Sequence, residues 1–380
     1  MSTTSMLTSN SLTVKRWSMQ AFIDMYKNTA FGRMMSRGTI YKADELNNAN
    51  RGDNVTFSFT GILTGTGTGE GGTLVGNEEA LDLNSDTLVV NVFRHAVNNP
   101  NDGTIEQQRT NVRFEQQART LLPKFHSARL DASVFNQLAG VDSTTITADT
   151  TVYSGTDKLF VQGLNSVTAP SSSRIVRAGG AASDEALTSS DTFTLDLIDA
   201  ALELARTTYP TIEPLDGDEF DLFISPQQEV DLKRDATGKI QWYTNELAMI
   251  TGGKTDDNYI TKGSIPGIKP IGKYANVNII PSFRVAAGEN SATSAAIPTV
   301  KRAVLCGRNA AVYGSPMGGT LKDQDVPFRF YTQFQDYDYF KGIEARMLYG
   351  LKKLRFSGGT GAVQDFGSIV ISTFAGSHTS

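Results

Sequence analysis

One run of residues with helical periodicity constrains the fold of this chain more than any other feature. After a turn-forming cluster at 98–103, apolar side chains recur at steps of three and four on one face: Phe114, Ala118, Leu121, Phe125, Ala128, Ala132, Phe135 and Ala139. Thr104 can cap the start and Gly140 the end, so we predict a helix of roughly 36 residues, or about 54 Å at 1.5 Å per residue. Pro123 predicts a kink, or two abutting helices, at 121–123. Such a helix is a spine along which other elements pack.

A glycine-rich segment precedes this helix and lies between two predicted strands. Residues 54–63 alternate apolar and polar side chains, and a second strand is predicted at 87–93. The segment between them, 61–76, offers little side chain to pack because of its closely spaced glycines: Gly65, Gly67, Gly69, Gly71 and Gly72. An isolated two-stranded ribbon is marginal in water. We therefore predict a long two-stranded arm with a flexible tip that needs a partner surface.

The rest of the chain mixes a few helices with many strands, which is typical of an α+β fold. A helix is predicted at 191–209, with Asp191 or Ser190 as its N-cap and Pro210 at its end. Pro226 begins a short helix at 227–234. The predicted strands are 219–225, 277–281, 303–306, 328–334, 340–349, 352–356 and 368–374.

Two segments have patterns that predict less regular structure. Residues 1–50 hold sparse apolar side chains and one candidate helix at 14–35, so this segment needs cover from its own chain or from a neighbour. Residues 143–190 are rich in Ser, Thr, Gly and Ala, with short strand-like pieces at 145–152 and 159–161. We interpret this second segment as a surface insertion on the core.

Composition narrows the class of protein. At 380 residues the chain is long enough for two or more packed regions. Its formal net charge of -5, with both signs mixed along the sequence, makes tight direct binding of DNA an unfavourable hypothesis. The one cysteine, Cys306, excludes an internal disulfide framework and fits a reducing cytoplasm. Neither a signal peptide nor a membrane span is predicted, so we expect a soluble, unexported protein.

Glycine and histidine motifs that could carry chemistry lack the context that the chemistry needs. Residues 67–72 satisfy G-x-G-x-x-G, but Thr73-Leu74-Val75 follows instead of a helix N-terminus. Gly253-Lys254-Thr255 resembles the end of a phosphate-binding loop whose first glycine is replaced by Ala248. The histidines have no ligand spacing: His95, His126 and His378. We therefore predict no enzyme activity, no cofactor and no metal site.

Charged motifs point to contacts between subunits. The tripeptide Arg51-Gly52-Asp53 favours a tight turn before a strand over a receptor-adhesion site. Adjacent acids on loops are usually solvated, and we expect Glu78 and Glu79 to meet arginines of a neighbouring subunit. The basic residues at 346–355 alternate between the two faces of a strand, so salt bridges between subunits are a better interpretation than DNA contacts.

Several short sequences, taken together, resemble the major capsid proteins of tailed phages, in a podophage branch of the Hong Kong 97-type family. The likeness spans most of 51–374 and rests on these residues: Arg51-Gly52-Asp53-Asn54-Val55-Thr56-Phe57, Gly76-Asn77-Glu78-Glu79, Gln108-Arg109, the helix end at 131–135, Phe223-Ile224-Ser225-Pro226 with Asp231-Leu232, and Gly350-Leu351-Lys352-Lys353. The resemblance implies an N-terminal arm at 1–50, an extended β loop at 51–103, a peripheral domain with the spine helix at 104–210, an axial domain at 211–325, and return strands of the peripheral domain at 326–380.

This resemblance also implies a function and partners. Copies of the chain would form hexamers and pentamers of an icosahedral virion shell around double-stranded DNA, with a scaffold, a portal and decoration proteins as further partners. The candidate subunit-interface residues are Arg51, Asp53, Gly65, Gly67, Gly69, Glu70, Glu78, Glu79, Lys352 and Lys353. The alternatives are an encapsulin-like compartment of the same fold and, less favoured, a nucleotide-binding enzyme that uses Gly253-Lys254-Thr255.

Overall fold

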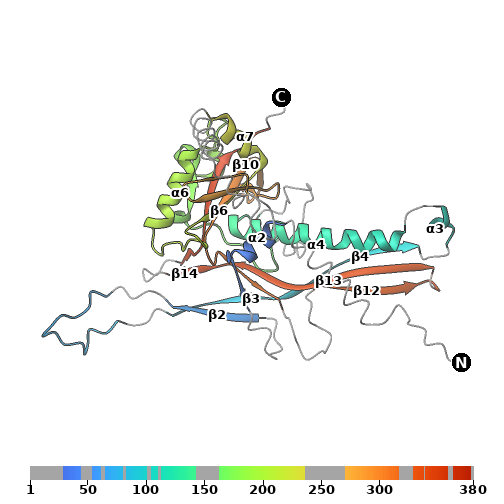
Figure 1. The fold of residues 1–380 in the computed structure, drawn as a ribbon, viewed down its shortest axis with the longest axis horizontal. Helices are drawn as coiled ribbons and strands as arrows, with labels where there is room; N and C mark the ends of the chain where they lie inside the picture. Colours follow the sequence, from blue (N-terminus) through green and yellow to red (C-terminus); the bar gives the residue numbers. More distant parts are fainter. Residues whose placement is uncertain are drawn as a thin grey trace, which may run out of the picture.

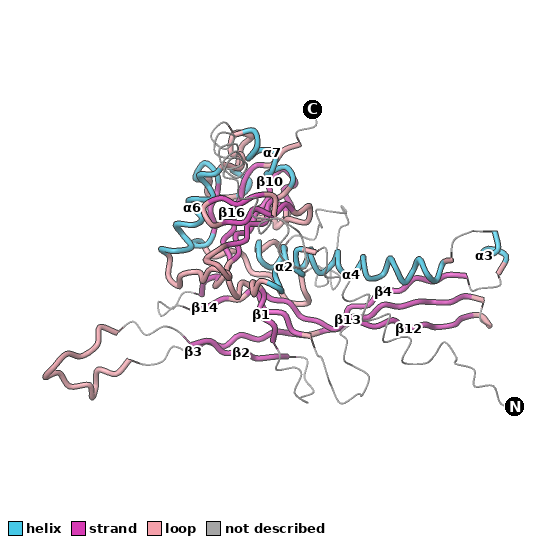
Figure 2. Tube along the Cα trace, viewed as in Figure 1, coloured by secondary structure: helices cyan, strands magenta, loops and turns pink. Residues whose placement is uncertain are grey.

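The computed structural model describes residues 29–43, 54–60, 65–79, 83–100, 104–109, 113–142, 162–235, 270–315, 328–337, 339–357 and 363–377. These residues form an elongated molecule in which a compact, mostly sheet-containing part adjoins a long helix and long strands (Figure 1). The arm projects beyond the compact part at one end, and the long strands extend to the other. Figure 2 shows that sheet dominates, with one helix much longer than the others.

A five-stranded sheet underlies the long helix. Its strand order is β1-β11-β13-β12, with β4 also paired to β13, and its members are β1 (Ile40–Ala43), β4 (Asn91–Pro100), β11 (Ala311–Gly314), β12 (Phe328–Gln335) and β13 (Phe340–Lys353). β4 and β12 pair antiparallel with the same stretch of β13 on its two sides. We call these three strands the ribbon. Every second residue of β13 from Ile343 to Tyr349 is buried, which gives the ribbon one core face.

The long helix is α4 (Phe114–Ala139), and it packs on the core face of the ribbon. Gly140 ends it in the left-handed conformation at φ 64°, as predicted. The predicted start at Thr104 is wrong for α4, because Arg113 is extended there; Thr104 instead accepts a hydrogen bond from Gln107 N, 3.3 Å, at the start of the short α3 (Ile105–Arg109). The alternative of two helices abutting at 121–123 is also wrong, since α4 runs unbroken through Pro123.

A seven-stranded sheet forms the compact part. Its order is β5-β16-β10-β6-β8-β7, with β9 on β10, and its members are β5 (Ile175–Arg177), β6 (Phe220–Ile224), β7 (Gly272–Tyr274), β8 (Val277–Pro281), β9 (Ala287–Glu289), β10 (Ala296–Cys306) and β16 (Ser368–Phe374). Helix α6 (Leu195–Thr207) packs on one face. The end of α4 packs on the other, where the rings of Phe135 and Phe223 lie 5.6 Å apart. Because both faces are covered, β6 is buried along its whole length.

Helix starts near this sheet differ from the prediction in one case. The predicted helix after Pro226 is confirmed as α7 (Pro226–Arg234), with Ser225 and Gln228 forming a capping box. The predicted N-cap of α6 is wrong: Thr194 occupies that position, because the Asp191 carboxylate instead accepts hydrogen bonds from the backbone N and hydroxyl of Thr188 at 2.8 and 2.7 Å.

The arm consists of β2 (Asn54–Thr60) and β3 (Leu83–Val89), which pair antiparallel. The predicted second strand at 87–93 is divided, because the chain passes from β3 to β4 at Val90. Residues 65–79, which we call the loop tip, contain no regular secondary structure. A small hairpin of β14 (Arg355–Ser357) and β15 (Val363–Asp365) lies beyond the end of β13.

Each of the two sheets contains strands from more than one of the predicted domain ranges. β16 and α6 lie outside 211–325 yet belong to the seven-stranded sheet and its core, whereas β11 lies inside that range and belongs to the five-stranded sheet. The names axial and peripheral domain stay predictions.

Over its described residues, 162–190, the segment interpreted as a surface insertion adds the edge strand β5 and several buried side chains to the compact part. β5 pairs with β16, and the short 3-10 turns Ser172–Arg174, Ala178–Gly180 and Asp184–Ala186 contribute the buried residues Arg174, Ala178 and Asp184. The sequence pattern did not indicate these buried positions, because one of them is the charged residue Asp184. Its carboxylate is buried between Arg302, at 2.7 Å, and Arg177, at 3.1 Å. The strand-like pieces at 145–152 and 159–161 lie outside the described residues.

Candidate assembly interface

The loop tip is closed by its own hydrogen bonds. Gly65 N donates to Glu79 Oε2 and Gly76 N donates to Glu78 Oε2, both at 2.7 Å. Two further turns are closed by backbone bonds, from Gly72 N to Gly69 O and from Asn77 N to Leu74 O, each 3.0 Å. The two glutamates predicted to meet arginines of a neighbour therefore each place one oxygen on the backbone of their own loop. Their negative charge stays at an exposed position.

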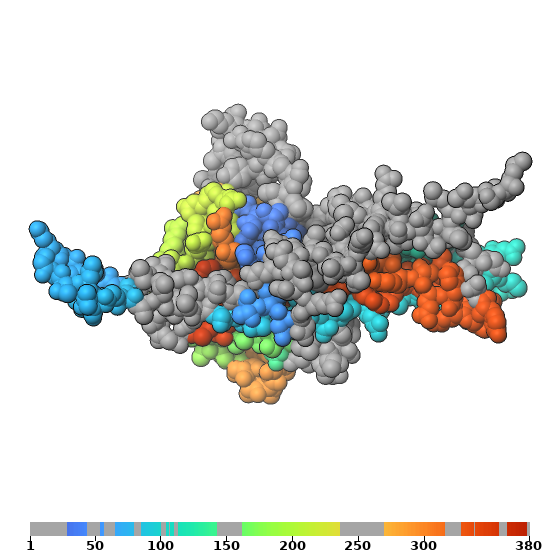
Figure 3. All heavy atoms as spheres, turned by 90° about the horizontal axis from the view of Figure 1, so that it is seen from below, coloured from blue at the N-terminus to red at the C-terminus, as the bar shows by residue number. Residues whose placement is uncertain are grey.

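The surface of this tip is apolar as well as acidic. Leu74 is 65% exposed and Val75 is 82% exposed. Glu70 is exposed in the turn that the hydrogen bond between Gly69 and Gly72 closes. The tip stands clear of the body in the space-filling view (blue, left in Figure 3). Residues 67–72 do not lead into a helix, so the glycine pattern lacks the arrangement of a dinucleotide site. Arg51, Asp53 and the 253–255 motif lie outside the described residues.

Lys352 and Lys353 are both engaged within their own chain. The ammonium of Lys352 pairs with Asp86 and also donates to Thr87 O at 3.1 Å, which ties the base of the arm to β13. Lys353 is buried and its Nζ lies 2.9 Å from Asp365 Oδ2. The structure thus brings Lys352 to the arm, whereas burial removes Lys353 from the surface of this chain. Strand alternation predicted opposite faces but could not identify the acidic partners.

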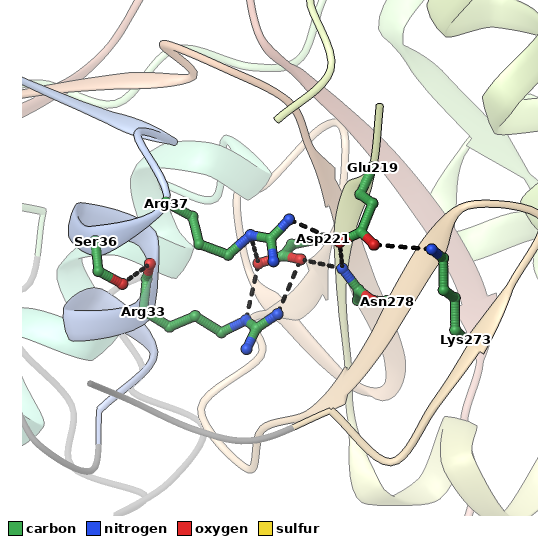
Figure 4. A network of polar contacts seen from close by, with 7 residues as sticks. All are labelled: Arg33, Ser36, Arg37, Glu219, Asp221, Lys273 and Asn278. Atoms are coloured by element: carbon green, nitrogen blue, oxygen red, sulfur yellow. Dashed lines mark hydrogen bonds and ion pairs between the residues drawn. The ribbon is translucent and has the colours of Figure 1, made fainter. Parts of the chain in front are cut away.

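Six polar residues, which we call the anchor network, connect the short helix α2 (Ala30–Ser36) and its C-cap Arg37 to the seven-stranded sheet (Figure 4): Arg33, Arg37, Glu219, Asp221, Lys273 and Asn278. Arg33 donates Nε and Nη2 to Asp221 at 2.8 and 3.1 Å, and Arg37 Nη2 lies 2.9 Å from Glu219. Burial alone would raise the pKa of Glu219, but hydrogen bonds from Lys273, Asn278 and Arg37 outweigh it and lower that pKa to about 2.

A second contact fixes the same helix to α4. The carboxylate of Asp131, on α4, accepts a hydrogen bond from Phe31 N at 3.0 Å, so it satisfies a backbone donor at the first turn of α2. Burial raises the pKa of Asp131 to about 6 despite this bond. Phe31 and Met34 are fully buried against their own chain. Residues 29–37 are therefore held against α4 and the seven-stranded sheet of their own chain. The charged residues that hold them were not predicted from the sequence.

Between α4 and the ribbon lies a cluster of aromatic rings that includes both described histidines. The His126 ring lies 4.8 Å from that of Phe93 and 5.2 Å from that of Phe328, and His95 stacks on Phe125 at 4.2 Å. Burial lowers the pKa of His126 to about 4. The histidines pack as rings here, and the described residues contain no group of His, Cys, Asp or Glu arranged to hold a metal ion.

The far end of the ribbon exposes aromatic side chains that are not among the predicted interface residues. Phe334, Tyr337 and Tyr339 surround the turn between β12 and β13 and are exposed, Tyr337 completely. Among the described helices, none combines the length and apolar character that crossing a membrane requires. Exposed apolar or aromatic side chains therefore lie at both ends of the molecule, on the loop tip and at the turn between β12 and β13.

Comparison with known proteins agrees with this architecture and defines the class of protein as a structural subunit of a phage capsid. The chain belongs to the phage capsid protein family, whose model matches residues 4–377. It is 26% identical to the major capsid protein of Pseudomonas phage KPP25 over 386 residues, which cover 93% of each chain.

Solved capsids share the fold. The capsid of Ralstonia phage GP4 matches with a TM-score of 0.70 and 22% identity over 100% of both chains. The capsid of cyanophage Pam1 matches with a TM-score of 0.62 and 16% identity, over 90% of this chain and 92% of the other. The predicted α+β fold of the Hong Kong 97 type is confirmed.

Proposed function

We propose that this chain is a major capsid protein that self-assembles as hexamers and pentamers into an icosahedral shell around double-stranded DNA. The observation that carries the proposal is the projecting arm, whose tip is exposed at every residue from 65 to 79. A loop that is closed by its own hydrogen bonds and still exposes Leu74 and Val75 presents apolar surface that a neighbouring copy would cover. Family membership and the relative from Pseudomonas phage KPP25 support the same function.

The proposed mechanism is the sum of many modest contacts between symmetric copies. Assembly would take place in the host cytoplasm with a scaffold and a portal, and decoration proteins would bind the finished virion shell. The net charge of -5 suits a wall that encloses DNA without retaining it. A cellular compartment of the same fold would enclose protein cargo and need no DNA, so the contents of purified shells discriminate between the two.

The first test is expression of the chain, alone and with its scaffold, followed by negative-stain electron microscopy. Uniform shells, capsomers or tubes are expected; monomers under both conditions would contradict the proposal.

Deletion of residues 65–72 should leave a folded monomer that assembles poorly. The matched control is Gly69→Ala, because a Cβ at Gly69 meets no atom within 4 Å and its φ is not positive. Normal shells from the deletion variant would exclude a clamping role for the tip.

A further inference from the structure

The ribbon is strongly basic. Its three strands contain six lysines and arginines, one in β4, one in β12 and four in β13, and a single acidic residue, Glu344. The whole chain has a formal net charge of -5, so positive charge is concentrated here. The three lysines of the ribbon are all paired with acids of other elements: Lys341 with Glu115, Lys352 with Asp86 and Lys353 with Asp365. The positive charge that is left belongs to the arginines.

These three arginines lie directly opposite one another across the ribbon. In the register of the strands, Arg346 of β13 pairs with Arg329 of β12 on one side and with Arg94 of β4 on the other. The residue before each of them in the sequence is buried in the core that the ribbon shares with α4, so the arginines occupy the opposite face. We call these three residues the arginine row.

The row carries positive charge that its own chain does not balance. Like charges directly opposite on neighbouring strands destabilise a sheet. Glu344 binds Arg346 through two hydrogen bonds, at 3.0 and 3.3 Å. Within the described part of the chain, no carboxylate pairs with Arg94 or Arg329, and Nη2 of Arg329 is buried without a hydrogen-bond partner. The row has three cations and one anion, so an external anion would stabilise it.

The row can be reached from the side of the ribbon that faces away from α4. Arg94 is exposed, and the side chain of Arg346 is 32% exposed. Figure 3 views the molecule from this side, where strands of the ribbon (orange and cyan, right) reach the surface. A ligand would therefore contact Arg94 and Arg346 first, whereas Arg329 adds charge from within the sheet.

Neighbouring residues on the same face can also donate hydrogen bonds to an anion. Asn98 and Gln333 are exposed, and both pair with Gly342, four residues before Arg346 on β13. Arginine and amide side chains are among the groups that make most protein contacts to the phosphates and sugars of DNA. A guanidinium is a planar fork of donors that binds phosphate oxygens in pairs. A phosphodiester chain offers consecutive anions to a row of cations, whereas a single carboxylate offers one.

We propose that the arginine row binds the phosphate backbone of the DNA that the shell encloses, so that this face of the ribbon is turned toward the interior. This inference rests on the proposed function and assigns one surface of the subunit to its DNA. Phosphates carry no base sequence, so the contact is independent of sequence. The net charge of -5 keeps the contact of each copy weak, and many copies along one DNA molecule act together.

Binding of a short duplex to the unassembled chain measures the contact. The probe is a fluorescently labelled DNA duplex of arbitrary sequence, and its anisotropy is recorded at about 50 and 200 mM salt. Neutralisation of two phosphates, by Arg94 and Arg346, predicts that affinity falls about 12-fold over this range. Glu344→Gln should bind the duplex more tightly than wild type, because the variant lacks the anion that competes for Arg346. Absence of binding by wild type at the lower salt would overturn the proposal.

Charge removal tests which arginines are responsible. Arg94→Gln/Arg346→Gln should weaken duplex binding several-fold at the lower salt and remove most of its salt dependence. The matched control is Arg206→Gln/Arg308→Gln, which removes the same charge from exposed positions away from the ribbon. Thermal unfolding shows whether each variant is folded. Equal weakening by the two pairs would mean that only net charge matters, and it would overturn the assignment.

Crosslinking in DNA-filled particles tests whether this face meets DNA in the shell. The photo-crosslinking amino acid p-benzoylphenylalanine, in place of Asn98, should become attached to DNA when the particles are irradiated. The matched control places it at Gln117, an exposed residue of α4 on the other side of the ribbon. Attachment to DNA from position 117 and not from position 98 would overturn the proposal.

Carboxylates of a neighbouring subunit are the competing anions, and the same particles distinguish them. If position 98 becomes attached to protein and not to DNA, the row is a contact between subunits and the proposal is wrong. The proposed function would stay intact, because filled particles have formed. Failure of the wild-type chain to form particles with its scaffold would contradict the proposed function as well.

Discussion

Lys353 and Asp365 form an ion pair in the interior of the protein, with 2.9 Å between Nζ and Oδ2 and side chains that are 1% and 0% exposed. Nζ of Lys353 also donates to Thr168 O at 3.1 Å, and Arg355 Nε lies 3.2 Å from the other carboxylate oxygen. The pair thereby joins the end of β13 to β15 and to the segment around Thr168. Residue 353, a candidate for contacts between subunits, holds one subunit together.

Replacing Lys353 by Met should destabilise the unassembled chain. The change leaves a buried carboxylate with only part of its partners, and breaking a buried ion pair costs roughly 3 kcal/mol. Urea denaturation measures the free energy of unfolding. Lys352→Met is the matched control, because this neighbour forms a partly exposed pair with Asp86 and should cost less than about 1 kcal/mol. Equal losses from both variants would contradict the structural role of Lys353.

The anchor network predicts a dependence of stability on acid pH. The pKa of Glu219 is about 2 in the folded chain and near 4.5 in the unfolded chain, so its stabilising effect is complete above about pH 4.5 and is lost as pH falls toward 2. Glu219→Gln should therefore lower the unfolding temperature at pH 7 more than at pH 3. The control Glu203→Gln, on the exposed side of α6, should follow the wild-type profile. A constant difference between Glu219→Gln and wild type at all pH values would refute this.

The bounds of short strands and helices that are flanked by turn residues or proline could be predicted closely from the sequence. The bounds of β8 and β16 match the predicted 277–281 and 368–374, and Pro226 correctly marks the start of α7. Local chemistry determines such elements, because turn residues flank a short apolar run. The long helix was predicted with the correct end and the wrong start, because the apolar periodicity begins only at Phe114, and the capping residue Thr104 begins the separate helix α3.

Contacts between distant strands could not be predicted in the same way. Nothing near Arg94 in the sequence indicates Arg329 or Arg346, and the buried partners of Asp184 and Lys353 are equally remote. A one-residue change of register would place each arginine on the core face. The loop tip was a candidate from its closely spaced glycines and its glutamates, whereas the alignment of Arg94, Arg329 and Arg346 required the register of the ribbon.

His126 should make the chain less stable in mild acid. Burial among Phe93, Phe125 and Phe328, with a smaller effect from His95, lowers its folded pKa to about 4 from about 6.5. The unfolded chain therefore binds a proton that the folded chain does not, and stability falls as pH drops from about 6.5 to 4. His126→Phe should raise the unfolding temperature relative to wild type at pH 5 more than at pH 8. An unchanged difference would mean that the ring is protonated without cost.

Gly350 of β13 should tolerate no side chain, because the strand there crosses the base of the arm at close range. A Cβ on Gly350 would lie 2.2 Å from the carbonyl oxygen of Val89, at the end of β3, and neither backbone can yield without disturbing its sheet. Overpacking of this kind costs roughly 1–3 kcal/mol. Gly350→Ala should therefore lower the free energy of unfolding by that amount and increase proteolysis of the arm.

Gly342→Ala, on the same strand, is the matched control. A Cβ at Gly342 would meet only Gln333 O, at 3.5 Å, which is an ordinary contact. The free energy of unfolding of this variant should stay within about 0.5 kcal/mol of wild type. Equal effects of the two substitutions would show that loss of glycine from a strand, and not the contact with the arm, determines the cost.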